Sequence, residues 1–286
     1  MPESRPLGSS SIPKVAGVQA SGANTRRLLA DPRPLLGFFT RLPGASCASL
    51  ESIVQAFPLV PVVGWVTGLI GALIALLLAP VLPPAALAAV LLVSLVGLTG
   101  LNQTDGLLDL GDGLMVHGDA ERRRQVMHDP SAGVGAVGAV LFTYLLSYGA
   151  LVGIAQQAGG VALFDRGSLT LAAAVVEAEV FCRLTYPVLA WRGRSSHGGL
   201  GSAFIEGFGL RHVAVSLLVA APALLGAFWL GWPPLVLGLA AAGIVAAILL
   251  RVSGRLLGGI GGDVLGASQE LARAAVLLAV SLGLGV

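Results

Sequence analysis

Asn102-Gln103-Thr104-Asp105-Gly106-Leu107-Leu108-Asp109-Leu110-Gly111-Asp112-Gly113 is the segment at which the character of the sequence changes. Residues 52–104 contain no Asp, Glu, Lys or Arg, and three aspartates then follow within eight positions. An uncharged run of this length is typical of membrane-spanning helices, since about 20 apolar residues cross the hydrocarbon core. The segment therefore predicts a helical membrane protein with carboxylates at the end of a span.

The three aspartates are spaced to share one side of a helix. Asp105, Asp109 and Asp112 stand at offsets of four and seven residues, which fall within about 60° of one another on an α-helix. Three like charges so close repel unless a cation lies among them. Carboxylate oxygens favour Mg²⁺ or Mn²⁺ over Zn²⁺. We expect these residues to bind such a metal, with the glycines among them breaking the helix to make room. The alternative is an acidic helix end that faces water.

The composition supports the membrane class. Hydrophobic residues make up 55% of the 286 residues and charged residues 11%, and the mean hydropathy is +0.86. Lipid tolerates only helices or closed barrels, and these apolar runs are too long for barrel strands. We therefore expect an all-α polytopic helical bundle with about seven transmembrane helices. The expected spans are 57–79, 85–103, 133–156, 168–191, 212–230, one that follows 231–234 and ends near 250, and 271–286.

The N-terminal part is expected to differ from the rest. Residues 1–34 hold five basic residues and no apolar segment of a signal peptide, so we expect a mobile basic tail. Residues 35–286 are expected to form one transmembrane catalytic domain that begins with a short interfacial or re-entrant segment at 35–43. Arg41 in that segment is a candidate contact for a phosphate or a lipid headgroup. Cys47 and Cys182 offer no metal-binding spacing, and reduced thiols are expected.

The basic residues are distributed unevenly between the two sets of loops that the expected spans define. The tail together with Arg41, and the loops 105–131, 192–211 and 251–270, hold fourteen basic residues, whereas the opposite loops hold only Arg166. Positive charge marks the cytoplasmic side of membrane proteins. We therefore expect a multi-pass protein of the cytoplasmic membrane whose functional loops all face the cytoplasm.

The fourth expected span contains charges that lipid does not tolerate without partners. Glu177, Glu179 and Arg183 lie within it, and Glu179 and Arg183 are four residues apart. Ionisable residues within a span are usually functional. They predict either an ion pair between Glu179 and Arg183 or a polar cavity continuous with the aspartate site.

A second candidate segment lies near the C-terminus. Its run Gly258-Gly259-Ile260-Gly261-Gly262-Asp263 is flexible enough for the backbone amides of Gly261 and Gly262 to approach a phosphate. Asp263 is expected as the N-cap of a helix on which Asp263 and Glu270 share a face. His117 and His128 lie near the aspartates and are either bases or solvated loop residues.

These motifs together resemble one protein family, the cobalamin synthases, which are adenosylcobinamide-GDP ribazoletransferases. Taken singly, each motif would be weak evidence, but their order and spacing over residues 35–286 are specific. One departure is Gln103, which stands where many members have a histidine two residues before the first aspartate. The similar segments are Phe39-Thr40-Arg41-Leu42-Pro43; residues 57–60 with Gly64 and Gly68; residues 105–113 with Met127-His128-Asp129 and Gly133; and residues 258–267 with Glu270.

The resemblance implies an Mg²⁺-dependent transfer of adenosylcobinamide phosphate from adenosylcobinamide-GDP to a hydroxyl of α-ribazole or its 5′-phosphate, with release of GMP. It leaves the lower-ligand base and the oligomeric state open. We expect Asp105, Asp109 and Asp112 as catalytic residues that bind the metal, one of which can also be the general base, with Asp263 as a further catalytic residue. The expected substrate-binding residues are Arg41, Gln103, Arg122, Arg123, Gly261, Gly262 and Glu270.

Two other functions fit part of the sequence. Asp109-Leu110-Gly111-Asp112-Gly113 begins like the aspartate motif of CDP-alcohol phosphotransferases, but the residues that should follow are absent. A transporter would explain the charges at 177–183, yet it should show inverted repeats with paired broken helices. No such repeat is recognisable, so both functions remain alternatives to the synthase.

Overall fold

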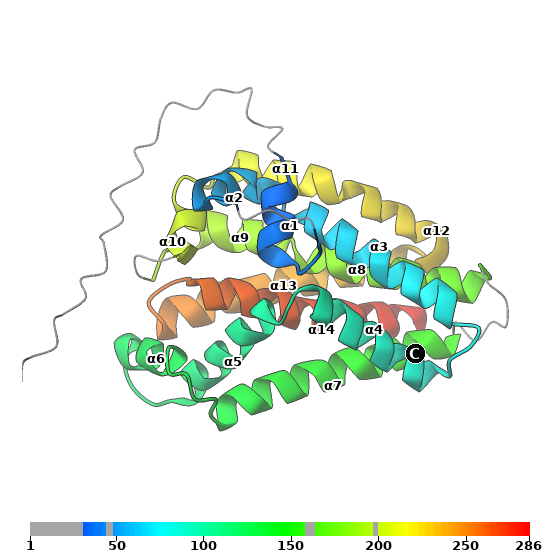
Figure 1. Ribbon diagram of the computed structural model, residues 1–286, viewed down its shortest axis with the longest axis horizontal. Helices are drawn as coiled ribbons and strands as arrows, with labels where there is room; N and C mark the ends of the chain where they lie inside the picture. The colour runs from blue at the N-terminus through cyan, green and yellow to red at the C-terminus, as the bar shows by residue number, and fades with distance from the viewer. Residues whose placement is uncertain (1–30, 44–47, 158–163, 197–199) are drawn as a thin grey trace, which may run out of the picture. The chain divides into compact units, whose positions relative to one another are not determined.

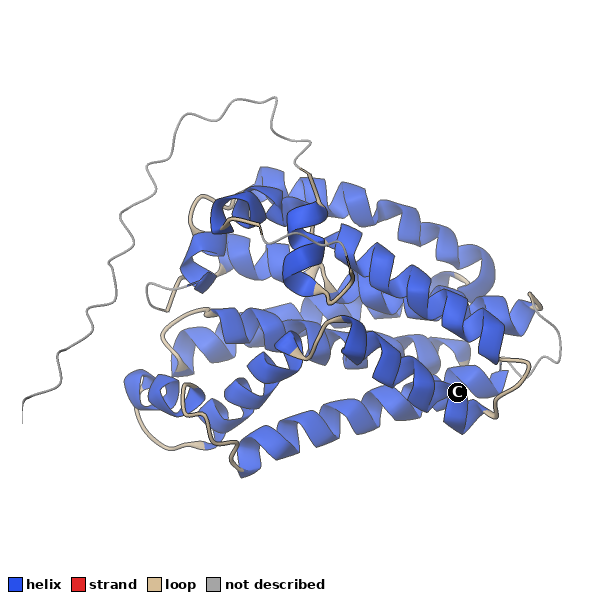
Figure 2. Ribbon diagram, viewed as in Figure 1, coloured by secondary structure: helices blue, strands red, loops and turns tan. Residues whose placement is uncertain are grey.

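The computed structural model describes residues 31–43, 48–157, 164–196 and 200–286. Most of the basic tail, Cys47 and much of the loop 157–167 lie outside the described residues. Residues 31–286 form one compact unit, and its described secondary structure is helical throughout (Figure 2). The helices, with 3₁₀ segments as η, are α1 Arg33–Phe39, α2 Leu50–Ala56, η2 Phe57–Leu59, α3 Pro61–Leu78, α4 Pro84–Leu98, α5 Asn102–Met115, α6 Ala120–Met127, α7 Val134–Gln157, α8 Arg166–Cys182, α9 Thr185–Arg192, α10 Leu200–Ile205, α11 Leu210–Ala220, η3 Ala221–Gly226, α12 Ala227–Leu230, α13 Trp232–Leu256 and α14 Gly262–Leu284.

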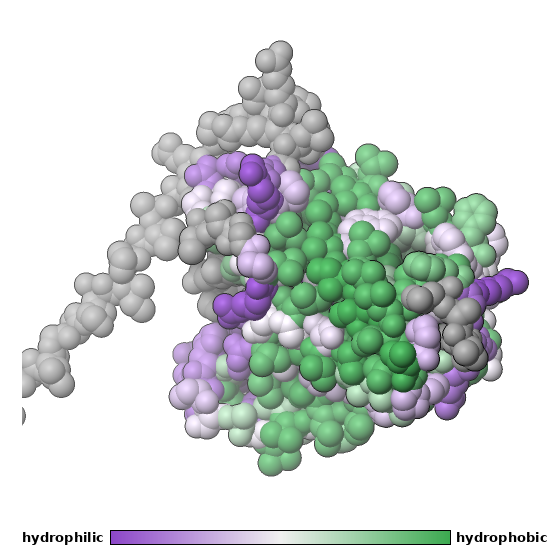
Figure 3. Space-filling model, turned by 45° about the vertical axis from the view of Figure 1, so that its right-hand side comes forward, coloured by the Kyte–Doolittle hydropathy of each residue, from purple (hydrophilic) through white to green (hydrophobic). Residues whose placement is uncertain are grey.

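The all-α membrane class is confirmed. Five helical segments in the described part of the chain are long and apolar enough to cross a membrane: α3, α7, α11 through α12, α13 and α14. A sixth is added if α4 and α5, which bend by 93° at their junction, are taken as one broken span. Figure 3 shows a broad apolar surface between hydrophilic ends. The expected span at 168–191 is divided into α8 and α9, so length and composition do not give seven spans.

The last span begins earlier than expected. α13 continues to Leu256 and α14 begins at Gly262, so most of the predicted loop at 251–270 is helical. Only residues 257–261 connect the two helices, where Gly258 adopts a φ of +78° that side chains disfavour. Asp263 lies in the first turn of α14 and is not its N-cap, which is Gly261.

α14 lies at the centre of the bundle (Figure 1). It packs against α5, α7, α8 and α13. In its apolar 18-residue stretch 72% is buried, compared with 28% in the corresponding stretches of α7 and α13. The face toward lipid is therefore small. This central position explains how α14 accommodates the ionisable residues Glu270 and Arg273, which are directed into the protein.

Three polar connections gather at one end of the bundle. α6, α10 and the α13–α14 turn lie together at the left of Figure 1, while the α3–α4 and α12–α13 turns lie at the right. Two contacts join these segments: Arg124 Nη1 donates to the Leu257 carbonyl at 2.6 Å, and the Ile260 amide donates to the Arg194 carbonyl at 2.7 Å. The predicted functional loops therefore meet in space.

Candidate active site

The aspartate segment is a continuous helix. α5 begins after Gly100 and Leu101, both in the left-handed region, and runs without a break through its glycines. The expectation that these glycines break the helix is therefore wrong. Their role is instead to let other segments pack closely against α5. A Cβ on Gly106 would lie 2.6 Å from the Asp263 carbonyl oxygen, and one on Gly111 would lie 2.5 Å from the Gly135 carbonyl oxygen.

The contact at Gly106 brings a further carboxylate to the site. It sets α5 directly against the first turn of α14, so that Asp263 lies next to Asp105 and Asp109. Asp105 is exposed and Asp109 is half-buried. Desolvation, and then the charges of Asp263, Asp105 and Asp112, raise the pKa of Asp109 to about 7. The crossing of α5 and α14 is thus an acidic centre that strongly favours positive charge.

Asp112 has a different environment from the other aspartates. Its Oδ2 accepts from the Gly133 amide at 2.6 Å, and its Oδ1 accepts from the Ala136 amide at 2.8 Å. These amides belong to the start of α7, where backbone N–H groups have no partner within the helix. Asp112 therefore caps α7. If Asp112 bound a metal as predicted, the metal would compete with both of these hydrogen bonds for its carboxylate oxygens.

The donor chemistry at the crossing fits Mg²⁺, although the side chains do not enclose an ion. No three His, Cys, Asp or Glu side chains in the described part of the chain lie close enough to hold a metal by themselves. Mg²⁺ usually keeps several waters and takes one or two carboxylates together with substrate phosphates. Asp105, Asp109 and Asp263 supply such carboxylates, so the residues present suit an ion that arrives with its substrate.

The predicted phosphate-binding arginines fall into two groups. Arg123 is engaged, because its Nη1 donates to the Gly113 and Leu114 carbonyls at 2.9 and 3.0 Å, at the C-terminal end of α5. Arg122 is exposed on α6. Arg41 is also exposed and covers Gly100 at the α4–α5 junction. Arg41 and Arg122 are accessible to a substrate, whereas Arg123 stabilises the polypeptide.

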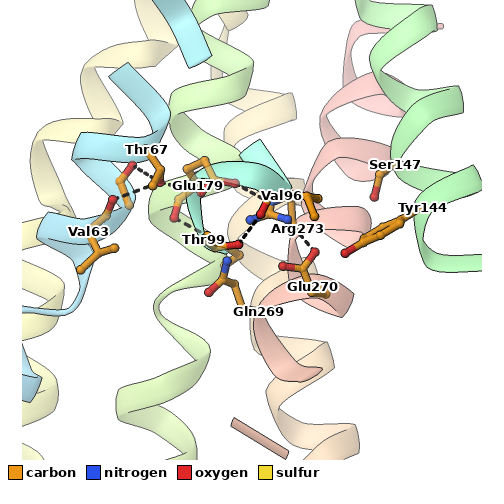
Figure 4. Close-up of polar contacts among 12 residues, drawn as sticks. Val63, Thr67, Val96, Thr99, Tyr144, Ser147, Glu179, Gln269, Glu270 and Arg273 are labelled. Carbon is orange, nitrogen blue, oxygen red and sulfur yellow. Dashed lines mark hydrogen bonds and ion pairs between the residues drawn. The ribbon is translucent and has the colours of Figure 1, made fainter. Parts of the chain in front are cut away.

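A buried ionic network lies deeper in the bundle (Figure 4). Arg273 Nε donates to Glu179, and Arg273 Nη1 donates to Glu270 Oε2 at 2.6 Å. Thr67 on α3 donates to the other oxygen of Glu179 at 2.7 Å. The predicted pair between Glu179 and Arg183 is therefore wrong, because Arg273 from α14 takes the place of Arg183.

Arg183 instead lies between aromatic rings. Its guanidinium carbon is 5.6 Å from the Phe39 ring centre and 5.9 Å from that of Tyr186. Its three nitrogens have no hydrogen-bond acceptor among the described residues. Tyr186 donates to Gln269 at 3.0 Å, so polar groups continue from here to α14.

Two predicted substrate-binding residues belong to this interior. Gln103 is 3% exposed and Glu270 is 1% exposed, so neither reaches the surface of the acidic centre. Gly261 is also buried, whereas Gly262 is exposed at the start of α14. Gln103 on α5 and Glu270 on α14 are therefore buried residues of the two helices that carry the acidic centre.

Sequence reasoning missed Arg273 and the approach of the 193–196 segment to the start of α14. Arg273 could have been found, because it is an ionisable residue within the last apolar segment, three positions after Glu270. The approach of residues 193–196 carries no such signal. It depends on a bridge between Ser195 and Ile260, just before α14, which only the folded chain reveals.

The sequence matches known proteins along most of its length. Residues 32–281 match the model of a family described as cobalamin-5-phosphate synthase. The chain is 38% identical over 251 residues to an adenosylcobinamide-GDP ribazoletransferase from Halorubrum lacusprofundi, covering 86% of this chain and 94% of the relative. It is 28% identical over 261 residues to one from Methanosarcina barkeri, covering 87% and 91%. No solved structure shows a significant match.

Proposed function

The chain belongs to the cobalamin-5-phosphate synthase family, and on that premise we propose that it is an adenosylcobinamide-GDP ribazoletransferase of the membrane. The observation that carries the proposal is the crossing of α5 and α14, where Asp105, Asp109 and Asp263 meet at the polar end of the bundle. The family match favours this reaction over the CDP-alcohol phosphotransferases and over a transporter.

The reaction exchanges one phosphorus–oxygen bond for another. A hydroxyl oxygen of α-ribazole, or of its 5′-phosphate, bonds to the phosphorus that carries adenosylcobinamide. The bond from this phosphorus to the GMP oxygen breaks, and GMP leaves with the electron pair. We assign acceptance of the hydroxyl proton to one of the clustered carboxylates, as general base. Bound Mg²⁺, or Mn²⁺ in its place, would neutralise the charge of the pyrophosphate.

The chain's own residues account for charge and position. Asp105, Asp109 and Asp263 would hold the metal, and Asp112 would keep α7 against α5. Arg41 and Arg122, the two predicted phosphate-binding arginines that are exposed, would contact the pyrophosphate of adenosylcobinamide-GDP. The buried network of Glu179, Arg273 and Glu270 would hold α14 in register beneath the acidic centre.

We assign the acidic end of the bundle to the cytoplasmic side of the cytoplasmic membrane. The support is the charge distribution in the sequence: residues 1–43, 105–131, 192–211 and 251–270 hold fourteen basic residues, against one in the opposite loops. Both substrates are water-soluble, and this placement lets them reach the site from the cytoplasm.

The test is a reconstituted reaction. Purified protein is incubated with adenosylcobinamide-GDP and α-ribazole, or its 5′-phosphate, with and without Mg²⁺, while GMP and the corrinoid product are measured. Formation of both in equal amounts, dependent on Mg²⁺, is expected. Absence of GMP release with either acceptor, from protein shown to be folded, would exclude this function.

A further inference from the structure

Glu177 lies in the interior of the bundle, apart from the acidic centre. It is 1% exposed, and neither of its carboxyl oxygens has a hydrogen-bond donor among the described residues. It lies eleven residues along α8 from Arg166, which begins this helix at the end of the bundle opposite the acidic centre (Figure 1). Eleven residues span about 16 Å, and half of a hydrocarbon core is about 15 Å. Glu177 therefore lies near the middle of the membrane.

The neighbouring Glu179 shows how this bundle holds an ionised carboxylate. One of its oxygens accepts a hydrogen bond from Arg273, and the other accepts from Thr67 at 2.7 Å. Glu177 is two residues earlier and so lies on a different side of α8, where no described residue supplies either kind of partner. One helix thus carries a carboxyl group whose charge is compensated and another whose charge would not be.

The elements that pack against α8 bring no compensating charge to Glu177. Of these elements, α3, η3 and α12 contain no ionisable side chain. The ionisable residues of the other three are Tyr144 and Tyr148 on α7, Arg251 and Arg255 on α13, and Asp263, Glu270 and Arg273 on α14. Among the described residues none of these groups acts on Glu177, for which removal from water is the single influence.

The outer cover of Glu177 is an irregular part of an apolar span. α11 ends at Ala220 and is followed by the 3₁₀ segment η3 and the short helix α12. Pro222 in η3 has no amide N–H, so the Val219 carbonyl lacks the donor that a 3₁₀ turn would supply three residues later. Trp65 on α3 donates its indole N–H to this carbonyl at 3.0 Å instead. The break in the span is therefore stabilised by a side chain from another helix.

Gly226, the last residue of η3, lies directly against Glu177. A Cβ on Gly226 would collide with Glu177 Oε1, so a side chain does not fit at this position. Gly226 is itself half-buried, and the nearby Leu225 and Phe228 are 60% and 79% exposed on the apolar surface. Only a main chain without a side chain therefore separates the carboxyl group of Glu177 from lipid.

A pocket at the same end of α8 gives water a route toward Glu177. Its volume is about 390 Å³, and its described lining includes Arg166, Thr170 and Trp229. Thr170 Oγ1 donates to the Trp229 carbonyl at 3.5 Å, which places Thr170 against α12. Glu177 follows Thr170 by seven residues, two turns further on the same face of α8 and about 10 Å deeper. A proton can therefore reach Glu177 from the end of the bundle opposite the acidic centre.

We propose that Glu177 is a proton-binding site within the membrane, where it is a neutral carboxylic acid that lipid-soluble carbodiimides modify beside Gly226. An unpaired carboxylate in these surroundings is far more costly than the neutral acid, because the charged form loses its hydration and gains no partner. A proton satisfies the carboxyl group without further ligands, whereas a metal ion needs several oxygen ligands. The inference goes beyond the proposed reaction and does not depend on it.

Dicyclohexylcarbodiimide tests for the neutral acid from the lipid phase. The carboxyl oxygen bonds to the central carbon of the reagent while the acid proton moves to one nitrogen. The acyl group then migrates from this oxygen to the other nitrogen and gives a stable acylurea. Unaltered protein in proteoliposomes is treated and its peptides are mapped by mass spectrometry. We expect an adduct at Glu177 that declines as the pH is raised, and none at the ion-paired Glu179, which is the internal control.

Infrared spectroscopy detects the proton without a reagent. The difference spectrum between the unaltered protein and Glu177→Gln should contain the C=O band of a protonated carboxyl group. This band should shift in D₂O, because the proton exchanges with water. Glu177→Gln should leave the Tm unchanged, since one neutral group replaces another. Glu179→Gln, the matched variant, should lower the Tm, because Arg273 loses an ionised partner.

Two results would overturn the proposal. A carboxylate band in place of the acid band, with or without added Na⁺ or K⁺, would mean that Glu177 is ionised in the membrane. Labelling of neither glutamate, or equal labelling of Glu177 and Glu179, would mean that the two carboxyl groups do not differ as their partners indicate. The labelling uses the unaltered protein, so it decides the question even if a variant fails to fold.

Discussion

Residues of one type on one helix face have different tasks in this protein. Asp109 lies among Asp105 and Asp263 at the crossing of α5 and α14, whereas both carboxylate oxygens of Asp112, three residues further on, accept hydrogen bonds from amides at the start of α7. Spacing alone predicts the shared face but not the partner of each carboxylate. The partners come from α14 and α7, which are distant in the sequence.

The first prediction separates the two tasks. Asp109→Asn should abolish turnover, because an amide is a poor ligand for Mg²⁺, while the Tm is unchanged or higher because repulsion is relieved. Asp112→Ala should lower the free energy of unfolding by about 0.5–2 kcal/mol, the usual loss of a helix cap. It should keep turnover per folded molecule. Turnover is measured in proteoliposomes and thermal unfolding in detergent. Normal turnover of Asp109→Asn at limiting Mg²⁺ would contradict the assignment of Asp109 as a metal ligand.

The second prediction concerns pH. The pKa of Asp109 is raised from the ordinary 3.8 to about 7, so the folded protein binds a proton that the unfolded chain has released. This contribution to stability is fully present below pH 3.8 and is lost as pH rises through about 7. Without metal, the Tm should therefore fall across this window, and Mg²⁺ should reverse part of the fall at pH 7. Asp109→Asn should show a flatter profile, and an equally steep profile in that variant would contradict the assignment.

At the scale of the elements, close helix contacts decide where the chemistry lies. α5 meets α14 at Gly106, and the acidic centre exists because no side chain separates these backbones. The sequence contains these glycines, but they resemble helix breakers until their neighbours are known. Their close packing explains why α5 remains helical and why Asp263, far along the chain, joins the aspartates.

The third prediction tests this contact. Gly106→Ala places a Cβ within 2.6 Å of the Asp263 carbonyl oxygen, which backbone atoms cannot easily avoid. The two helices should separate slightly, with a loss of about 1–3 kcal/mol in stability and a large loss of turnover. Gly243→Ala is the matched control: Gly243 is exposed within α13, with nothing within 4 Å of an added Cβ. It should retain full activity. Equal behaviour of the two variants would exclude the contact as the cause.

For the whole molecule, the sequence predicted the class and the meeting of the functional loops, because long apolar runs and charge distribution are properties of the chain itself. It predicted the α3, α7 and α13 spans to within a few residues at most boundaries, but it began the last span at 271 although α14 begins at Gly262. The error has a physical cause: Glu270 and Arg273 lower the local hydropathy, yet they are buried in an ionic network with Glu179. Pairing between distant helices is invisible to a local measure.

The fourth prediction tests the orientation on which the proposed reaction depends. In a background of Cys47→Ser and Cys182→Ala, single cysteines are introduced at the polar end by Ser131→Cys, Glu206→Cys and Gly254→Cys. All three positions are exposed, and they represent the α6–α7, α10–α11 and α13–α14 regions. Val81, 69% exposed in the α3–α4 turn, supplies the opposite end as Val81→Cys. A membrane-impermeant thiol reagent added to intact cells should label only Val81→Cys.

Permeabilised cells provide the control, since all four cysteines should then react. The reasoning is geometric: Arg124 bonds Leu257 and Ile260 bonds Arg194, so the three loops share one end and must share one side of the membrane. Labelling of all three from outside, with Val81→Cys protected, would reverse the orientation and place the site away from cytoplasmic substrates. Labelling of only some of the three would contradict the arrangement of the helices themselves, because loops held together by hydrogen bonds cannot lie on opposite sides of a bilayer.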